Sequence, residues 1–370
     1  MIKICHVVDE MRIGGLENTI KEIALNLKGY DHRVWCLKKR GLMAQELENN
    51  GIGVTEFNFT GRLMPSLISR LIKELKQGKF DIIHAHGAFP GVWGTISGIA
   101  AKTPHIIIHC QNTYYDADVQ FKIKMFFLKK YVERFIAASY AVKESIVRCV
   151  SIDPKKIVII YNSAACLPTM GVEEKNASRL ALGIHPHDFV VGSISRLETH
   201  KGHRYLIDAV ESLRPAIPRL KCLIVGDGDA LRALRVATRN KGLEGIVNFT
   251  GWQKDINKFL AAMDVFVQPS TLREGLPLAL AEAASAGIAL IATDIGGNAE
   301  IVREGANGFI IHPKNAQELA GKIKYLYEYP DARNTYGKNS IKIWEQNFTL
   351  DTMLHKIDSL YQSVYHRTSQ

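Results

Sequence analysis

Two glutamates, Glu274 and Glu282, stand eight positions apart in a stretch that is otherwise small or apolar, EGLPLALAEAASAG. The stretch predicts a tight loop and then a helix rich in Ala and Leu, with Pro277 at its first position. The apolar strand MDVFVQPS comes immediately before it. A strand, a loop and a helix N-terminus together form a site for anions and hydroxyl groups at the carboxyl edge of a sheet. A plain helix with two solvated glutamates is the alternative.

Two cations, Arg196 and Lys201, share the loop SISRLETHKGH, which also follows an apolar strand. A guanidinium can bind phosphate through two hydrogen bonds, and an ammonium supplies a compact charge. The turn GDGD, which begins at Gly226, follows a further strand. The alternatives are two exposed surface cations and a plain connecting turn.

A third glycine turn, MRIGGLE, contains Gly14 and Gly15 and follows the first apolar strand. It offers backbone N–H groups to an anion at the start of the next helix. The turn is not GxGxxG, which argues against NAD, and the chain contains no GxxxxGK[ST] phosphate loop.

These loops need a scaffold, and the chain alternates apolar strands with helices along its length. Continuous apolar strands between helices predict parallel sheets that are covered on both faces, with ligands at the carboxyl ends of the strands. The expected strands are 2–9, 32–38, 54–59, 81–87, 105–112, 134–139 and 155–162, then 189–196, 219–228, 246–252, 263–270, 289–297 and 308–313.

The alternation breaks near residues 165–185, which lack a clean period and read as a linker and the entry to a second domain. We therefore expect an N-terminal domain over 1–167 and a C-terminal domain over 168–349. The tail, residues 350–370, predicts an amphipathic helix that packs back on the first domain. Two doubly wound domains of this kind would face each other across a cleft.

The amino-acid composition indicates which classes of partner and which cellular compartment suit the chain. Residues 1–167 hold 23 Lys and Arg against 15 Asp and Glu, whereas 168–370 hold 24 against 22. The basic excess suits an anionic membrane surface or substrate, and no nucleic-acid-binding motif is visible. No apolar run is long enough to cross a membrane. The six cysteines lie singly without CxxC spacing, which favours buried thiols in the cytoplasm.

The motifs SRLxxxKG, VGDG, FTG, EGLPLALxEAxxxG and GGxxEIV occur in this order. Together they resemble retaining glycosyltransferase family 4, whose fold is GT-B, over nearly the whole chain. The resemblance implies transfer of a hexose or N-acetylhexosamine from a nucleotide sugar, with UDP favoured, to a saccharide acceptor. A lipid-linked glycan or a lipopolysaccharide or capsule precursor is the expected acceptor.

The resemblance also implies that the domain over 1–167 lies on the acceptor side and that the domain over 168–349 binds the nucleotide sugar. It implies residue roles as well. Arg196 and Lys201 would bind the donor diphosphate, and Glu282 would bind the ribose hydroxyls. The sugar would be held by Glu274 with the backbone of Gly275, Leu276 and Pro277. The phosphates would also contact the Gly14–Gly15 turn and the Gly226 turn. His109 matches the histidine that family members place beside the donor sugar, although Asn162-Ser163 and His109-Cys110 depart from the usual family dipeptides.

The implied chemistry needs no metal and no other cofactor, because fixed cations and helix N-termini can neutralise the departing diphosphate. Same-face attack by the acceptor makes Glu274 a positioning group rather than a nucleophile. The Asp116–Asp118 and Asp227–Asp229 pairs are interpreted as structural. His84 and His86 are expected on opposite faces of their strand, with His84 in the core and His86 reaching the acceptor.

Residues 121–135, FKIKMFFLKKYVERF, predict a basic amphipathic helix that can lie on the inner, anionic face of the cell membrane. A core-facing helix with snorkelling lysines is the alternative. Two other functions stay open: a GT-B-like nucleotide-sugar epimerase, and a catalytically silent nucleotide-sugar-binding protein. An epimerase would consume the donor without an acceptor.

Overall fold

The structure is a computed structural model that describes residues 1–61, 64–167, 171–272 and 274–366. It divides into two compact units, Met1–Ser163 with Leu350–Gln370, and Ala164–Thr349. The first boundary falls four residues before the expected one. The last four residues of the expected tail helix, 367–370, lie outside the described residues.

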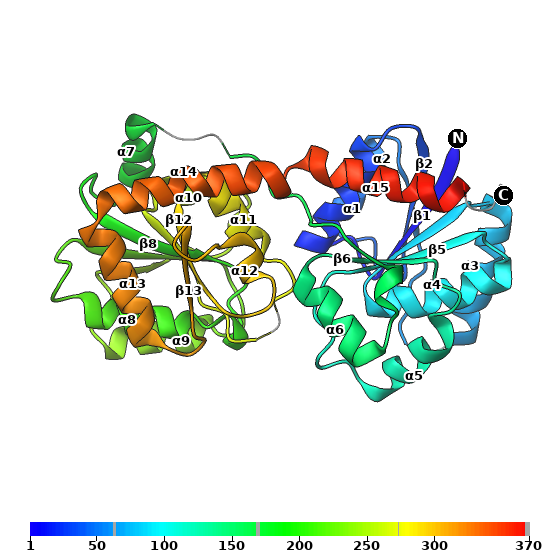
Figure 1. Cartoon of the computed structure of the whole chain (residues 1–370), viewed down its shortest axis with the longest axis horizontal. Coiled ribbons are helices and arrows are strands. Elements are labelled where there is room, and N and C mark those ends of the chain that lie inside the picture. Colours follow the sequence, from blue (N-terminus) through cyan, green and yellow to red (C-terminus); the bar gives the residue numbers. More distant parts are fainter. Residues whose placement is uncertain (62–63, 168–170, 273, 367–370) are drawn as a thin grey trace. The chain divides into compact units, whose positions relative to one another are not determined.

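Unit 1 is built on a seven-stranded parallel sheet of order β3-β2-β1-β4-β5-β6-β7 (Figure 1). The inner strands are apolar and buried on both faces, as the sequence pattern predicts. Its strands are β1 (Ile2–Val8), β2 (Tyr30–Cys36), β3 (Gly53–Glu56), β4 (Ile82–His86), β5 (His105–Cys110), β6 (Arg134–Ala137) and β7 (Ile157–Ile159).

Helices cover both faces of this sheet. They are α1 (Gly15–Asn26), α2 (Met43–Asn49), α3 (Met64–Gly78), α4 (Ala88–Ala101), α5 (Val119–Leu128), α6 (Tyr140–Val150) and α15 (Leu350–Tyr365), with the 3₁₀ turn η1 (Pro154–Lys156). The tail helix α15 buries Ile357, Leu360 and Tyr361 in the same core as Ile4 and Ile82. This packing places the end of the chain in unit 1.

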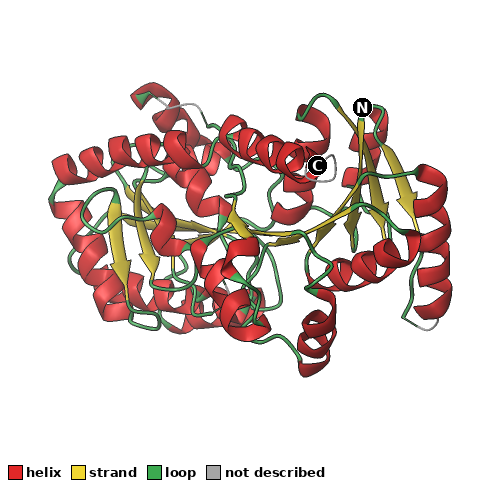
Figure 2. Ribbon diagram, turned by 45° about the vertical axis from the view of Figure 1, so that its right-hand side comes forward, coloured by secondary structure: helices red, strands yellow, loops and turns green. Residues whose placement is uncertain are grey.

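Unit 2 contains a six-stranded parallel sheet of order β10-β9-β8-β11-β12-β13. Helices again flank the strands (Figure 2). Its strands are β8 (Phe189–Ile194), β9 (Leu220–Val225), β10 (Val247–Phe249), β11 (Val265–Gln268), β12 (Ala289–Thr293) and β13 (Gly308–Ile311). Its helices are α7 (Val172–Ala181), α8 (His203–Leu213), α9 (Leu231–Asn240), α10 (Asn257–Ala262), α11 (Leu278–Ser285), α12 (Asn298–Ile301), α13 (Ala316–Glu328) and α14 (Pro330–Asn347), with the 3₁₀ turn η2 (Thr199–Lys201).

The stretch 165–185, expected as a linker and the entry to the second domain, contains helix α7 at its centre, while 168–170 lie outside the described residues. The helix begins where the N–H of Gly171 donates to the carboxylate of Glu174 at 2.7 Å, which is one half of a capping box. Its Arg179 is buried and donates to Asp264 at 2.6 Å. A buried ion pair anchors this helix instead of an apolar stripe, so its periodicity was weak.

No helix in the described residues has the length and apolar composition needed to cross a membrane. All six cysteines are free; Cys5, Cys36, Cys110 and Cys222 are buried as expected, whereas Cys166 is exposed.

Candidate functional site

The strand order of each sheet reverses at one point, between β1 and β4 in unit 1 and between β8 and β11 in unit 2. In open parallel sheets, ligands bind beside the carboxyl ends of the strands at such a point. Arg196 and Lys201 follow β8, and Glu274 follows β11. Lys201 and Glu274 therefore meet at the reversal point of unit 2, and Arg196 lies in the same loop as Lys201.

Glu274 is the centre of this group and is 4% exposed. Its Oε1 accepts hydrogen bonds from Lys201 Nζ at 2.8 Å, from Gln268 Nε2 at 3.0 Å and from the hydroxyl of Ser270. Among the described residues, none donates to its other oxygen, Oε2. The carboxylate is thus fixed through one oxygen and presents the second to a further donor.

Neighbouring loops approach the Glu274 group so closely that two positions require glycine. Gly296 has φ 56°, and a Cβ there would lie 1.9 Å from the carbonyl oxygen of Glu274. Gly202 has φ 73°, and a Cβ there would lie 1.9 Å from the carbonyl oxygen of Pro269. Both backbones are in the left-handed region that glycine tolerates. The loops after β8, β11 and β12 are therefore packed backbone to backbone around the site.

The segment between Glu274 and α11 is buried at Gly275, Leu276 and Pro277. Pro277 is the N-cap of α11 and not its first residue, because its ψ of 105° is extended. No described residue accepts a hydrogen bond from the N–H of Gly275 or Leu276. Free N–H groups at the start of an eight-residue helix suit an anionic ligand.

Arg196 follows the same strand as Lys201, but its side chain does not join the Glu274 group. Its side chain is 73% exposed and forms an ion pair with Glu198 in the same loop. Such exposed pairs contribute little to stability, so the guanidinium can exchange this partner for a ligand at small cost.

Glu282 lies on α11 and is half-buried. Burial raises the pKa of its carboxyl to about 7. None of the described residues donates a hydrogen bond to this carboxyl. It therefore titrates near neutral pH and would ionise more readily beside hydroxyl donors.

The Gly226 turn has its hydrogen bonds satisfied internally. The N–H of Gly226 donates to the carbonyl of Gly251 at 2.9 Å, and the N–H of Gly228 donates to the Asp227 carboxylate at 2.7 Å. In unit 1, the carboxylate of Asp118 caps α5 by accepting from the N–H of Phe121 at 2.7 Å. These contacts support the structural interpretation of Asp118 and Asp227.

The Gly14–Gly15 turn forms the start of α1, with Gly14 as N-cap in extended backbone. A Cβ on Gly14 would lie 2.4 Å from the carboxylate of Glu17, which also pairs with Arg12 at 3.6 Å. A carboxylate thus already lies at this helix N-terminus, where anions are favoured.

The prediction that His84 and His86 face opposite sides of their strand is wrong, because residues two apart on a strand share one face. Their rings lie 4.1 Å apart. His86 is 1% exposed and pairs with His6, so it presents no free surface within unit 1. His109, at the end of β5, is also buried, and its Nε2 accepts from Gln111 Nε2 at 3.2 Å. Burial lowers the pKa of His109 to about 3, so the ring is neutral at physiological pH.

Sequence reasoning missed Gln268 and Ser270, which hold the Glu274 carboxylate. Both are polar residues at the end of the apolar strand β11, and this position was the available signal. His203 was expected in a loop, but it is buried at the start of α8, and its Nε2 lies 3.2 Å from the Ser195 hydroxyl. Burial lowers its pKa to about 3.

Each half of the chain matches a known protein family. Residues 13–164 match the model described as Glycosyltransferase Family 4, and residues 174–343 match that of Glycosyl transferases group 1. The chain belongs to the group 1, family 4 glycosyltransferases. The resemblance inferred from its motifs and the GT-B fold class are confirmed.

Among its relatives is an Escherichia coli enzyme, UDP-Gal:alpha-D-GlcNAc-diphosphoundecaprenol alpha-1,3-galactosyltransferase. It is 29% identical over 310 residues, which are 80% of this chain and 79% of that protein. The putative glycosyltransferase EpsD of Bacillus subtilis is 26% identical over 74% of each chain. The crystal structure of Anabaena Alr3699/HepE with UDP superposes with a TM-score of 0.88, at 25% identity, over 98% of this chain and 100% of that one.

Proposed function

We propose that the chain is a retaining glycosyltransferase that moves a hexose or N-acetylhexosamine from a UDP-sugar to a lipid-linked saccharide or a lipopolysaccharide or capsule precursor. The observation that carries this proposal is the Glu274 carboxylate, fixed by three donors on Oε1 while Oε2 has none among the described residues. A rigid carboxylate with one open oxygen is suited to a sugar hydroxyl. The UDP-bound relative supports the choice of nucleotide.

The donor would be neutralised without a metal. Lys201 lies in the Glu274 group, Arg196 is exposed in the same loop, and the start of α11 has free N–H groups. Together they can offset the charge that develops on the diphosphate as the glycosidic bond breaks. Glu282 would accept hydrogen bonds from the ribose hydroxyls.

In unit 1, the Gly14–Gly15 turn would contact the phosphates, whereas His86, being buried against His6, is not proposed as an acceptor contact. His109, being neutral, would act as a hydrogen-bonding contact to the donor sugar and not as an acid.

The acceptor assignment is supported by the E. coli relative, whose name gives a diphosphoundecaprenol-linked sugar as its acceptor. The test is incubation of the purified protein with a panel of UDP-sugars and short-chain lipid diphosphate saccharides in EDTA. Product analysis by NMR should show one new glycosidic bond with the anomeric configuration of the donor. Glu274→Gln should abolish it. Donor conversion without acceptor would support the epimerase alternative, and an inverted product would refute retention.

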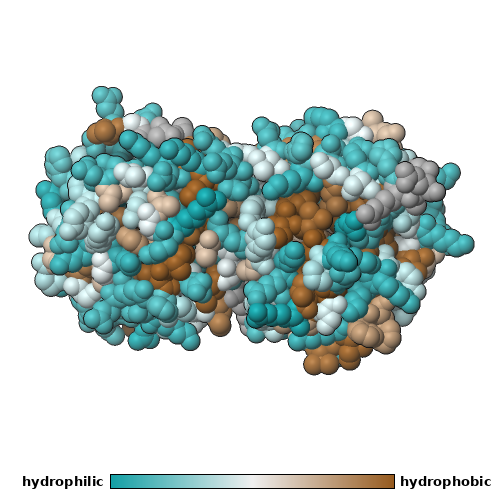
Figure 3. Space-filling model, in the orientation of Figure 1, coloured by the Kyte–Doolittle hydropathy of each residue, from teal (hydrophilic) through white to brown (hydrophobic). Residues whose placement is uncertain are grey.

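A basic and apolar surface on α5 supports a membrane-bound acceptor. The helix ends at Leu128, earlier than expected, and residues Arg134–Ala137 form β6 instead. It buries only Met125, while Ile123, Phe126 and Phe127 are 54–65% exposed. Apolar residues gather at the lower edge of unit 1 where α5 lies (Figures 1 and 3).

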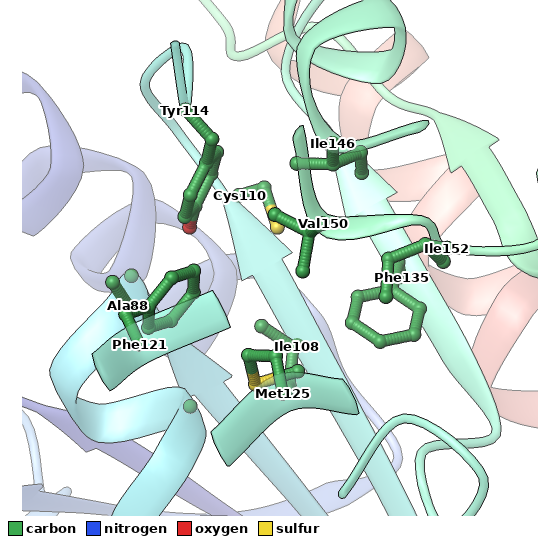
Figure 4. Close-up of a pocket in the computed structure, with 12 residues that line it drawn as sticks. Ala88, Ile108, Cys110, Tyr114, Phe121, Met125, Phe135, Ile146, Val150 and Ile152 are labelled. Atoms are coloured by element: carbon green, nitrogen blue, oxygen red, sulfur yellow. The ribbon is translucent and has the colours of Figure 1, made fainter. Parts of the chain in front are cut away.

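Lysines border this surface. Lys129 lies 4.9 Å from the Phe126 ring centroid, and Lys124 lies 5.2 Å from that of Trp93. Beneath α5 is an apolar cavity of about 10 Å³, lined by Met125 and its neighbours (Figure 4). That volume holds about one water and no lipid chain. We therefore propose that α5 rests on the anionic, cytoplasmic face of the membrane through its outer surface.

Changing four lysines to Gln should release the protein from vesicles that contain anionic lipid, since each basic residue near such a surface contributes ~1 kcal/mol. The four are Lys122, Lys124, Lys129 and Lys130. The matched control changes four exposed lysines of unit 2, namely Lys254, Lys258, Lys338 and Lys342, and should leave sedimentation unchanged. Equal binding of both variants would refute the membrane surface.

A further inference from the structure

A layer of histidines crosses the sheet of unit 1, from the first half of β2 to the ends of β4 and β5. His32 on β2, His6 on β1, His84 and His86 on β4, and His109 on β5 are all 3% exposed or less. His6 is the register partner of His84, and His86 is the partner of His109. Five imidazoles on one face of a parallel sheet are unusual in a position that apolar side chains normally occupy.

The hydrogen bonds of this layer have a defined direction. His32 Nε2 lies 3.2 Å from the carbonyl oxygen of Leu27, which can only accept, so this nitrogen carries the proton. In the neutral ring, Nδ1 of His32 then accepts from His6 Nε2 at 3.0 Å. Nδ1 of His6 in turn accepts from His86 Nε2 at 3.0 Å. This series of hydrogen bonds ends at His86 Nδ1, whose lone pair accepts no hydrogen bond from the described residues.

That lone pair is one of two unsatisfied positions on β4. His86 Nδ1 and His84 Nε2 are buried without a hydrogen-bond partner among the described residues. The other nitrogen of His84 lies 2.6 Å from the Tyr361 hydroxyl on α15. Buried polar atoms are normally satisfied by protein, water or an ion, so the unpartnered Nε2 of His84 points to an unseen partner, and the free Nδ1 of His86 leaves room for its ring to change tautomer.

We propose that His6, His84 and His86 bind a first-row transition-metal ion, with Zn²⁺ the expected occupant. One ring nitrogen from each residue lies within 4.8 Å of the others. Two nitrogen ligands of a tetrahedral zinc are ~3.4 Å apart, from bonds of about 2.1 Å. The His6–His86 separation of 3.0 Å needs to widen by only a few tenths of an ångström, whereas the His84 nitrogen must move closer.

The surroundings of the three rings suit ligation. Burial lowers the pKa of all three well below the usual value, so they are neutral ligands at pH 7. His32 and Tyr361 hold the outer nitrogens of His6 and His84, as second partners do in metal sites. When the ion binds between His6 and His86, the proton on His86 Nε2 moves to its free Nδ1. Three imidazoles without a carboxylate favour zinc, nickel or copper over magnesium or calcium, and a water completes the fourth position.

The site lies wholly in unit 1 and is independent of the proposed metal-free donor site in unit 2. The test uses the full chain, stripped of metal with chelator and titrated with Co²⁺ as a spectroscopic probe. One equivalent should bind and produce the visible absorption of a four-coordinate nitrogen site. His84→Gln and Tyr361→Phe should each weaken binding by about 10-fold or more.

The control is the double variant His185→Gln with His187→Gln, which removes an adjacent histidine pair in unit 2 and should leave the cobalt spectrum unchanged. If His84→Gln does not fold, X-ray absorption at the zinc edge of the wild-type protein decides the question, because three imidazole ligands give a characteristic scattering pattern. No bound ion, or cobalt bands lost in the double variant and kept in His84→Gln, would overturn the proposal.

Discussion

Glu274→Gln isolates the charge at the centre of the proposed donor site. Glutamine keeps the shape and one acceptor oxygen, so Gln268 and Ser270 retain a partner. Lys201, whose side chain is 14% exposed, loses its counter-charge. A charge-assisted hydrogen bond contributes ~1.5–3 kcal/mol and a neutral one ~0.5–1.5. Most of the loss comes from the weakened Lys201 hydrogen bond and from the partly buried ammonium that is left without a counter-charge. We therefore expect the free energy of unfolding to fall by about 2–3 kcal/mol.

For a unit of this size, that loss lowers the midpoint of thermal unfolding by roughly 5–10 °C. The matched control is Glu244→Gln, which breaks the exposed pair with Arg239 and should cost less than about 1 kcal/mol. Glu274→Gln also frees Lys201 for phosphate. Calorimetric titration should therefore show UDP affinity retained and the extra affinity of the UDP-sugar lost. A melting shift no larger than the control, with the sugar's contribution intact, would refute the reasoning.

Three further predictions concern the same unit. Lys201→Ala should weaken UDP binding by ~1.5–3 kcal/mol in a calorimetric titration, because it removes a charged partner of the diphosphate; unchanged affinity would remove Lys201 from the site. The raised pKa of Glu282, about 7, means that its carboxyl is protonated below pH 7 and ionised above it. UDP affinity should therefore rise by up to about 10-fold from pH 6 to pH 8 and become flat in Glu282→Gln; an unchanged slope in the variant would exclude Glu282 as its cause. Gly296→Ala should lower the melting midpoint by several degrees, whereas Gly321→Ala, in open space on α13, should not; equal shifts would contradict the close packing around Glu274.

The sheets were predictable because the strands are short apolar runs, many of them followed closely by Gly, Ser or Pro, and the structure contains a strand in every expected segment. The pairing of Lys201 with the Glu274 loop was implied by the family motifs, and the strand order explains it. The capped helix α7 was missed because its main anchor, the Arg179–Asp264 pair, joins residues far apart in sequence.

The opposite-face prediction for His84 and His86 misapplied the alternation of a strand, which the sequence does show. The histidine layer as a whole was missed for a different reason. Its members come from four strands, and only the parallel register brings His6 opposite His84 and His86 opposite His109. A sequence shows which residues alternate within one strand, but it does not show which residues of separate strands become neighbours. The hydrogen bonds that Gln268 and Ser270 donate to Glu274 likewise depend on how the loop turns after β11.

The central claim is a metal-independent nucleotide-sugar site built on Lys201, Glu274 and Glu282. The most direct test is a thermal-shift panel of UDP, GDP, ADP and their common sugars, with and without EDTA, since a ligand that binds only the folded state raises the melting midpoint. We predict a shift with UDP and one UDP-sugar that EDTA leaves unchanged and that Lys201→Ala reduces. A shift that requires a divalent ion, or none with any nucleotide, would contradict the account.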